Sequence, residues 1–439
     1  MKVLKAGTMI MLVLSLTVQA ASQSSGAVAP DSGDLDVTDL RMFVEVMDQV
    51  RSAYVEPVPD HQLWVYAVRG LLESLDPHSE FLDAQEYQDL KDDTSGSFDG
   101  VGLELGRDHG ELKVIAPIDD SPAAKAGIRA GDVIVRLNGQ LVHGQNYQRI
   151  LDQMRGNPGT HLKLTIMRSG NSKPLEFDLV RQIIAVSTVH GRWLESGFAL
   201  IRISMFAETT GKDVENVIHQ LQHEGTVRGL VLDLRNNPGG VLTSAIDVAD
   251  DFLDHGVIVS TRGRLPESNH QFLATPGQLL PGVPMVVLIN SGTASAAEIV
   301  SGALQDHHRA LILGTTSFGK GSVQSVLSLN DGQGIKLTTA RYFTPSGRSI
   351  QAQGITPDLT VLPADVTVHA SNSLYKEANL AGHLENPQTG TGSDEVQSAN
   401  NKEKELVSSD FQLYQALAVV KAANLLQASS ASPVLRTVQ

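Results

Sequence analysis

The chain of 439 residues contains no cysteine. Disulfide bonds, thiolate nucleophiles and cysteine-based metal sites are therefore excluded. The H-E-x-x-H pattern of zinc sites is also absent, and no other grouping of residues suggests a set of metal ligands. Positive charge is scarce, because the formal net charge is −15, and this disfavours a surface that binds nucleic acid. We therefore expect no metal, no cofactor and no nucleic-acid partner.

Apolar runs that could enter a membrane are missing beyond the first 20 residues. At the N-terminus, Lys2 and Lys5 precede a short apolar run, and Val18-Gln19-Ala20 supplies the small residues of a cleavage site. Residues 1–20 therefore predict a secretory signal peptide and a periplasmic location. The alternative is an uncleaved anchor, which would make the protein membrane-associated.

Composition and periodicity divide the remaining chain into blocks. Leu40, Phe43 and Met47 recur at helical spacing near the start, whereas polar residues dominate after Pro363. Strands and helices alternate after residue 183, which predicts an α/β multidomain protein. The predicted blocks are a flexible leader (21–36), an N-terminal helical region (37–96), a compact β-rich module (97–182), an α/β core (183–363), a linker (364–408) and a C-terminal helix (409–439).

The start of one expected helix presents the first candidate for chemistry. We expect a buried strand over 284–290 and a helix over 295–305, so Ser295 stands at a helix N-terminus. Free backbone N–H groups and the positive end of the helix dipole favour a developing oxyanion there. The structural alternative is that Ser295 only caps the helix, with Glu298 completing a capping box.

Lys320 lies between two glycines at the start of another expected strand, in the segment SFGKGSVQ. The flanking glycines allow neighbouring backbone to approach closely. Gln324 follows four residues later, on the same face of an extended strand, where it could orient the lysine amine. A lysine that acts as a base must be neutral, so its pKa must be lowered by burial. Ser295 and Lys320 would then form a nucleophile–base pair.

Two histidines near the end of the same helix are rival bases. His307 and His308 follow Ser295 by 12 and 13 residues, which corresponds to about 18 Å along a helix. Neither is expected to reach the serine, and we expect them to cap backbone carbonyls at the helix C-terminus. A G-x-S-x-G pattern is absent around Ser295, which argues against an α/β-hydrolase.

A glycine pair ends the segment DLRNNPGG. Gly239 and Gly240 can present backbone N–H groups without steric hindrance, so a second oxyanion donor is plausible there. A simple tight turn explains the pair equally well.

Four segments together resemble one family. They are SGTASAAEIVSGALQD, SFGKGSVQ, DLRNNPGG and RYFTPSGRSIQAQGITPD. Their order and spacing are similar to those of the carboxy-terminal processing proteases, also called tail-specific proteases, over about residues 38–363. The resemblance implies a crotonase-like core of ββα repeats. It also implies a serine endopeptidase with Ser295 as nucleophile, Lys320 as general base and Gln324 positioning the lysine.

The resemblance also implies an oxyanion hole. The backbone N–H of Ala296 and that of either Gly239 or Gly240 would form it. Many members carry serine where this sequence has Ala297. No catalytic role is assigned to that position, so the difference does not affect the expected activity.

Residues 97–182 resemble a PDZ domain inserted before the core. Such a domain binds an extended peptide by strand addition and captures its C-terminal carboxylate on loop amides. The implied substrates are proteins or peptides with flexible C-termini. The implied peptide-binding residues are Gly100, Val101, Gly102, Leu103 and Leu105.

Two alternatives come from other functional classes. The first is a catalytically silent PDZ scaffold, against which the intact Ser295, Lys320 and Gln324 argue. The second is an acyl-CoA enzyme of the crotonase fold, which the predicted signal peptide and the PDZ-like insertion disfavour.

An apolar helix near the C-terminus needs a partner surface. We expect it to pack on the N-terminal helix near Phe43 and Met47 of another subunit, which predicts a homo-oligomer. Docking onto its own core is the alternative, and an activating adaptor protein is a further partner left open. The apolar positions of this helix are Leu413, Leu417, Val420 and Leu425.

Overall fold

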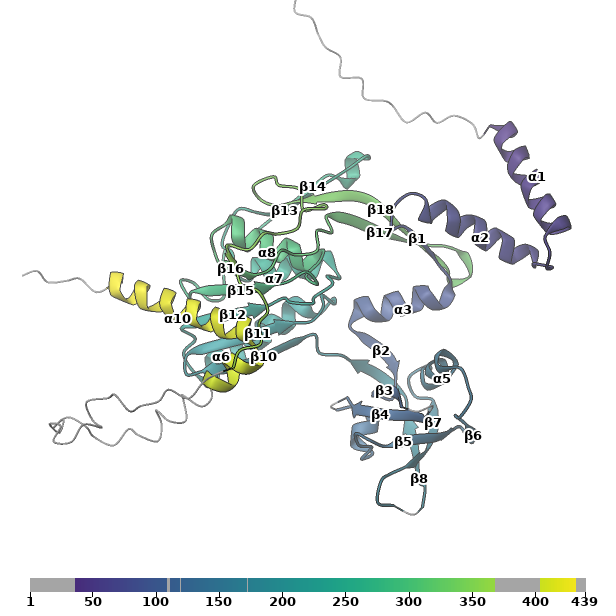
Figure 1. The fold of residues 1–439 in the computed structure, drawn as a ribbon, viewed down its shortest axis with the longest axis horizontal. Coiled ribbons are helices and arrows are strands. Elements are labelled where there is room, and N and C mark those ends of the chain that lie inside the picture. The colour runs from purple at the N-terminus through teal and green to yellow at the C-terminus, as the bar shows by residue number, and fades with distance from the viewer. Residues whose placement is uncertain (1–35, 109–110, 119, 172, 368–402, 432–439) are drawn as a thin grey trace, which may run out of the picture. The chain divides into compact units, whose positions relative to one another are not determined.

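The computed structural model describes residues 36–108, 111–118, 120–171, 173–367 and 403–431 (Figure 1). The predicted signal peptide, nearly all of the leader and most of the linker lie outside these residues. The chain divides after Val68 into two units, residues 1–68 and 69–439, which are described separately. Among the described residues, no helix is both long and apolar enough to cross a bilayer.

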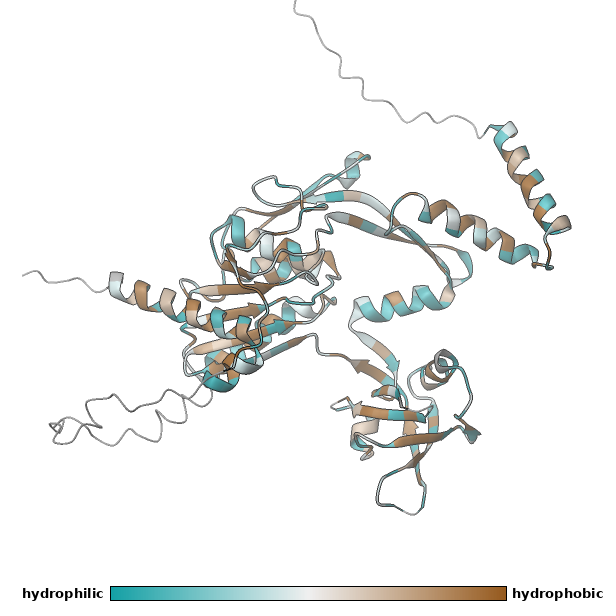
Figure 2. Ribbon diagram, viewed as in Figure 1, coloured by the Kyte–Doolittle hydropathy of each residue, from teal (hydrophilic) through white to brown (hydrophobic). Residues whose placement is uncertain are grey.

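The first unit contains α1 (Val37–Ala53) and the start of α2 (Asp60–Glu73). The predicted helical spacing is confirmed, and the rings of Phe43 and Trp64 join the two helices at 5.6 Å between centroids. No residue of α1 is buried, and Figure 2 shows apolar patches along both helices. Within the described residues, the apolar side chains of α1 stay largely exposed, whereas Leu63 and Leu72 of α2 are buried.

A six-stranded sheet forms the centre of the second unit. The first two strands pair antiparallel, and each later pair is parallel. The strand order is β10 (Val189–Glu195), β11 (Phe198–Ile203), β12 (Gly229–Asp233), β15 (Met285–Ile289), β16 (Leu311–Gly314) and β19 (Leu359–Thr360). This is the α/β core that the alternation of strands and helices predicts.

Both faces of this sheet are covered. Strand residues alternate between the two faces, so Leu230 and Leu232 belong to one apolar cluster and Val231 to another. The first cluster is completed by α6 (Thr210–Glu224), α7 (Leu242–Asp250) and α8 (Ala296–Asp306).

The opposite face is covered by the C-terminal helix α10 (Phe411–Ala431) (Figure 1). Leu413, Leu417 and Val420 are buried against the chain's own strands, whereas Leu425 is 66% exposed. The expectation that these first three residues need another subunit is therefore wrong, because the sheet already buries them. A helix over 403–409 also stands where a linker was expected.

A second, antiparallel sheet lies beside the core and was not expected from the sequence. It joins segments that are far apart in the chain, since Glu80 pairs with Lys336. Its path runs through β1 (Glu80–Leu82), β18 (Gly334–Phe343), β13 (Val257–Gly263) and β14 (His270–Leu273), with β17 (Ser322–Ser328) also on β18. Two 3-10 turns, Pro266–Ser268 and Asn330–Gly332, interrupt the connections.

The β-rich module follows α3 (Ala84–Ser95) and has its own apolar core. Strands β2 (Ser97–Gly100) and β9 (Gln182–Ala185) pair with each other, so the chain enters and leaves the module at one place. Its sheet contains β3 (Leu103–Asp108), β4 (Glu111–Pro117), β5 (Val133–Leu137), β6 (Gln140–Leu141), β7 (His161–Met167) and β8 (Leu175–Val180). Its helices are α4 (Pro122–Lys125) and α5 (Tyr147–Met154).

Candidate active site

Ser295 occupies the tight turn between β15 and α8, as the sequence predicts. Its backbone has φ 53° and ψ −116°, a conformation that stores strain in a residue other than glycine. A sharp strand-to-helix turn of this kind can present a nucleophile even without the G-x-S-x-G pattern, and Ser295 itself is buried, with 7% of its surface exposed. Gly239 makes the turn possible, because a Cβ atom there would lie 2.8 Å from Ser295 Cβ.

The side chain of Glu298 ties the serine turn to the lysine segment. This residue is fully buried. Its Oε2 accepts the backbone N–H groups of Ser295 at 2.8 Å and Lys320 at 2.9 Å. Its Oε1 accepts from the Ser317 hydroxyl at 2.5 Å and the Gly319 N–H at 2.7 Å. The capping glutamate of the structural alternative is therefore also the group that brings the two candidate catalytic segments together.

Lys320 is half-buried at the entrance to β17. Burial is the main cause that lowers the pKa of Lys320, and the positive charge of Lys336 adds to it. Nearby carboxylates, led by Glu80 and Asp76, raise the pKa and oppose this shift. The net direction is the one that a lysine base requires.

Gln324 contacts hydroxyl groups. Its Nε2 donates to Ser322 Oγ at 2.9 Å and to Thr338 Oγ1 at 3.3 Å. These contacts use the amide nitrogen, whereas an acceptor for the Lys320 amine would have to be the amide oxygen.

Tyr342 was not singled out from the sequence. It is buried in the core beside the serine, and its backbone N–H donates to Gly321 O at 2.7 Å. Burial raises the pKa of Tyr342 to about 12, against the opposite effect of a hydrogen bond with the Ser295 side chain. In the sequence, Tyr342 is marked only by its place in the segment RYFTPSGRSIQ, which belongs to the family resemblance. Its contact with Ser295 could not be predicted, because it depends on the long-range pairing of β18.

The glycine pair lies against the serine turn. A Cβ atom at Gly239 would also lie 3.0 Å from Ala296 N, so these two backbones are in contact. The Gly239 N–H donates to Asn237 Oδ1 at 2.9 Å. Of the two glycines, Gly240 therefore remains the better candidate for an oxyanion donor beside Ala296.

The histidines lie at the opposite end of α8 from Ser295, as expected. His307 is the residue that follows the last helical turn, and its Nε2 contacts the backbone oxygen of Val257 at 2.7 Å. The ring of His307 therefore binds a neighbouring strand. The sequence predicts a contact with a carbonyl of its own helix, and for His307 this prediction is wrong. His308 takes a φ of 52° just beyond it.

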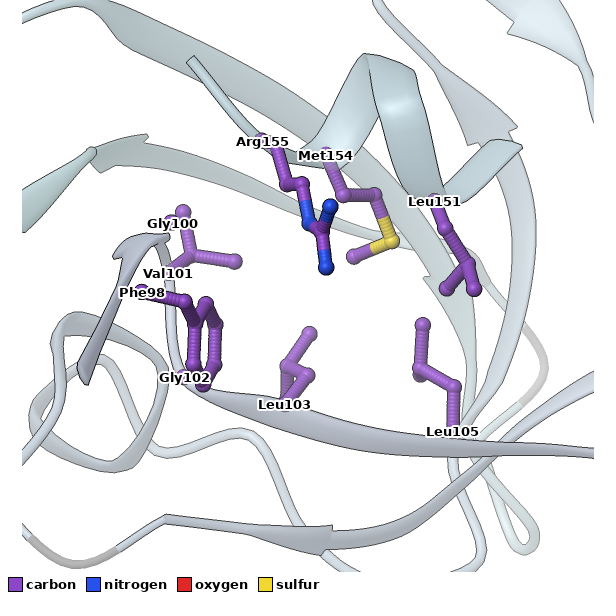
Figure 3. Close-up of a pocket in the computed structure, with 9 residues that line it drawn as sticks. All are labelled: Phe98, Gly100, Val101, Gly102, Leu103, Leu105, Leu151, Met154 and Arg155. Atoms are coloured by element: carbon purple, nitrogen blue, oxygen red, sulfur yellow. The ribbon is translucent and has the colours of Figure 1, made fainter. Parts of the chain in front are cut away.

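An apolar groove of about 190 Å³ lies between β3 and α5. Figure 3 shows Leu103 and Leu105 facing Leu151 and Met154 across it, with the Arg155 guanidinium beside them. All five residues expected to bind peptide line this groove. Four further lining residues were not expected from the sequence: Phe98, Leu151, Met154 and Arg155.

These residues supply the parts that acyl transfer needs. They include a serine at a helix N-terminus, a lysine with a lowered pKa and backbone donors against the serine. The described part of the chain holds no group of three or more metal-ligating side chains.

Comparison with known proteins identifies two matching regions. Residues 197–361 match the profile of peptidase family S41, and residues 113–168 match that of the PDZ domain. The chain is 44% identical over 391 residues to a carboxy-terminal-processing protease of Bartonella bacilliformis, covering 88% of this chain and 89% of that protein. It is 33% identical over 347 residues to the carboxy-terminal processing protease CtpA of Bacillus subtilis, covering 79% and 73%.

A solved structure gives a further match. The photosystem II D1 C-terminal processing protease is 32% identical, with a TM-score of 0.43, and the match covers 74% of this chain and 94% of that one.

Proposed function

Because the chain belongs to peptidase family S41 and is a carboxy-terminal processing serine protease with a PDZ domain, we propose that Ser295 is its nucleophile and Lys320 its general base. Gln324 positions the lysine amine. The alternatives of a silent scaffold and of an acyl-CoA enzyme are set aside, because the chain is a serine peptidase of this family.

The first half of the reaction forms an acyl-enzyme. The neutral Lys320 amine accepts the proton of the Ser295 hydroxyl as Oγ attacks the scissile carbonyl carbon. The carbonyl oxygen becomes an oxyanion, which the backbone N–H groups of Ala296 and Gly240 stabilise together with the N-terminus of α8. Collapse breaks the C–N bond, and the Lys320 ammonium gives its proton to the leaving amine.

Hydrolysis completes the cycle. A water molecule gives a proton to Lys320 and attacks the ester carbonyl of the acylated Ser295. The second tetrahedral intermediate collapses, the proton returns to Ser295 Oγ, and the new carboxylate product leaves.

One observation carries this assignment. Glu298 holds the backbone of Ser295 and the backbone of Lys320 on a single oxygen atom, although 25 residues separate the two in the chain. A buried carboxylate that accepts four hydrogen bonds fixes both segments at once, and fixed geometry is what nucleophile–base catalysis requires.

The test uses full-length protein and an unstructured protein substrate. Ser295→Ala, Lys320→Ala and Lys320→Arg should each reduce cleavage at least about 1,000-fold, because arginine remains protonated and cannot accept the serine proton. Lys421→Arg, which alters a lysine paired with Glu195 on the surface, is the matched control. Cleavage by Ser295→Ala at the wild-type rate would refute the assignment.

We propose that the groove of the PDZ domain selects substrates by their flexible C-terminal tails. An extended peptide can pair with β3 while an apolar side chain enters the space lined by Leu103, Leu105 and Met154. The glycines at positions 100 and 102 leave the loop backbone accessible to a terminal carboxylate.

We also propose a periplasmic location, on the basis of the signal-peptide pattern at residues 1–20.

We further propose a homo-oligomer that is built through the exposed apolar face of α1. Leu40→Asp in α1 should then lower the mass in solution, whereas Arg41→Asp should not. An activating adaptor would be sought by affinity capture with Ser295→Ala protein.

A further inference from the structure

Asp76 lies in the connection between α2 and β1. It binds Thr338 of β18, the residue that pairs with Gln324 of β17. Its Oδ1 accepts the Thr338 hydroxyl at 3.0 Å, and its Oδ2 accepts the Ser79 hydroxyl at 2.6 Å. The backbone N–H groups of His78 and Ser79 also donate to Oδ1. Although desolvation opposes it, the hydrogen bonds from Ser79, His78 and Thr338 hold the pKa of Asp76 below its usual value.

The Thr338 hydroxyl donates its only proton to Asp76. A carboxylate only accepts hydrogen bonds, so the hydroxyl must donate to Asp76. The Thr338 oxygen can then only accept from Gln324, which it meets at 3.3 Å. The Gln324 group that faces Thr338 must accordingly be the NH₂, and the amide oxygen must point elsewhere.

An irregularity in the sheet creates this contact. Ser322 pairs with Arg341 and Val323 with Ala340, so regular pairing would place Thr339 opposite Gln324. The register shifts after Val323, and Gln324 pairs with Thr338 instead. Bulges of this kind re-aim side chains next to functional sites.

We propose that Asp76 and Thr338 are positioning residues for the lysine base. Their relay fixes the orientation of the Gln324 amide, so that its oxygen and not its nitrogen is offered to the Lys320 amine. This inference rests on the proposed catalytic roles of Ser295 and Lys320.

The orientation matters because a neutral amine has one lone pair and two N–H groups. An amide oxygen accepts one N–H and leaves the lone pair free for the Ser295 proton. A reversed amide would donate its NH₂ to the lone pair and occupy the base. Asp76 is close enough to Lys320 for its charge to raise the pKa of the amine. Asp76 and Thr338 therefore lie near the lysine base that they are proposed to position.

The test separates hydroxyl polarity from packing. Thr338→Val keeps the shape and removes the donor, whereas Thr338→Ser keeps the donor. Thr339→Val is the matched control, because Thr339 lies on β18 beside Thr338 but its hydroxyl contacts the Ser325 hydroxyl of β17, at 2.8 Å. Each variant is measured in the full-length protein for kcat, KM, the pH dependence of kcat and the midpoint of thermal unfolding.

Thr338→Val should lower kcat about 10-fold or more with little change in KM, since proton transfer and not binding is affected. Loss of an acceptor for the charged amine should also move the alkaline rise of kcat to lower pH by about 0.5–1 unit. Thr338→Ser should restore most of the rate and the original pH profile. A merely structural role would lower stability without moving the profile.

Three outcomes overturn the relay. They are a Thr338→Val profile identical to that of Thr339→Val, failure of Thr338→Ser to restore the rate, and an unchanged pH profile in Thr338→Val. If Thr338→Val does not fold, Thr338→Ala is measured against Thr338→Ser by the same criteria. Full cleavage by Ser295→Ala would instead refute the proposed catalytic roles, so the two failures are distinguishable.

Discussion

The backbone N–H groups of Ser295 and Lys320 converge on one atom, Glu298 Oε2, at 2.8 and 2.9 Å. Both contacts use the backbone of Ser295 and of Lys320, so Glu298 occupies neither the serine hydroxyl nor the lysine amine. Glu298 itself needs no direct contact with a substrate to matter, since its position determines where both segments lie.

Glu298→Gln should damage both stability and activity. A glutamine NH₂ would face two donors where a carboxylate oxygen now accepts them, which should lower the free energy of unfolding by about 2–4 kcal/mol. We expect cleavage to fall at least about 100-fold. Urea unfolding and a cleavage assay measure the two effects. Glu267→Gln, at an exposed residue, is the control. Equal stability and activity of the two variants would contradict the role of Glu298 in holding the Ser295 and Lys320 segments together.

Gly239→Ala should inactivate the enzyme by displacing the serine. The added Cβ would lie 2.8 Å from Ser295 Cβ and 3.0 Å from Ala296 N, in a backbone with φ +101°. Gly277→Ala is matched for positive φ, at +129°, but its Cβ meets nothing within 4 Å. The control should lose only about 1 kcal/mol of stability and keep its activity. Comparable turnover in the two variants would show that the close approach is unimportant.

The rate of cleavage should rise with pH through neutrality and level off in alkaline solution. The base works as the free amine, so activity grows as the pH approaches the pKa of Lys320 from below. Since burial lowers that pKa, the rise should begin below the ordinary titration range of a lysine. The measurement is kcat against pH from 6 to 10 under chemistry-limited conditions, and a flat profile would argue against a titrating lysine.

Leu103→Asp should weaken the binding of C-terminal peptides. A carboxylate in the apolar groove costs desolvation energy, and we expect the Kd to rise about 10- to 100-fold. Fluorescence anisotropy with full-length Ser295→Ala protein gives this Kd without cleavage of the peptide. Leu141→Asp, at a 59% exposed residue of the same domain, should bind normally. An unaffected Leu103→Asp variant would exclude this groove.

Val420→Asp should lower the free energy of unfolding by about 3 kcal/mol or more, because Val420 is fully buried between α10 and the core sheet. Leu426→Asp changes a 73% exposed residue of the same helix and should stay within about 0.5 kcal/mol of wild type. Denaturant unfolding of the full-length variants decides this. Equal stabilities would mean that α10 does not pack on the core in solution.

The sequence was sufficient for features that depend on neighbours along the chain. The strand before Ser295, the helix after it and the glycines around Lys320 all follow from local patterns. Local patterns likewise predicted a compact β-rich module over residues 97–182, and the family resemblance implied that this module is a PDZ domain. All five residues implied to bind peptide line its groove.

Contacts between distant segments were decided only by the tertiary structure. The local sequence predicts Glu298 as a capping residue of its helix. No pattern near it in the chain indicates that its carboxylate also binds the backbone N–H groups of Gly319 and Lys320. The apolar face of α10 gave no sign of which surface would cover it, because its own sheet and another subunit offer the same kind of apolar contact. The pairing of Gln324 with Thr338 depends on a register shift between two strands. Local sequence fixes backbone preference and periodicity, whereas register and docking are set by the packing of segments that meet only in the folded chain.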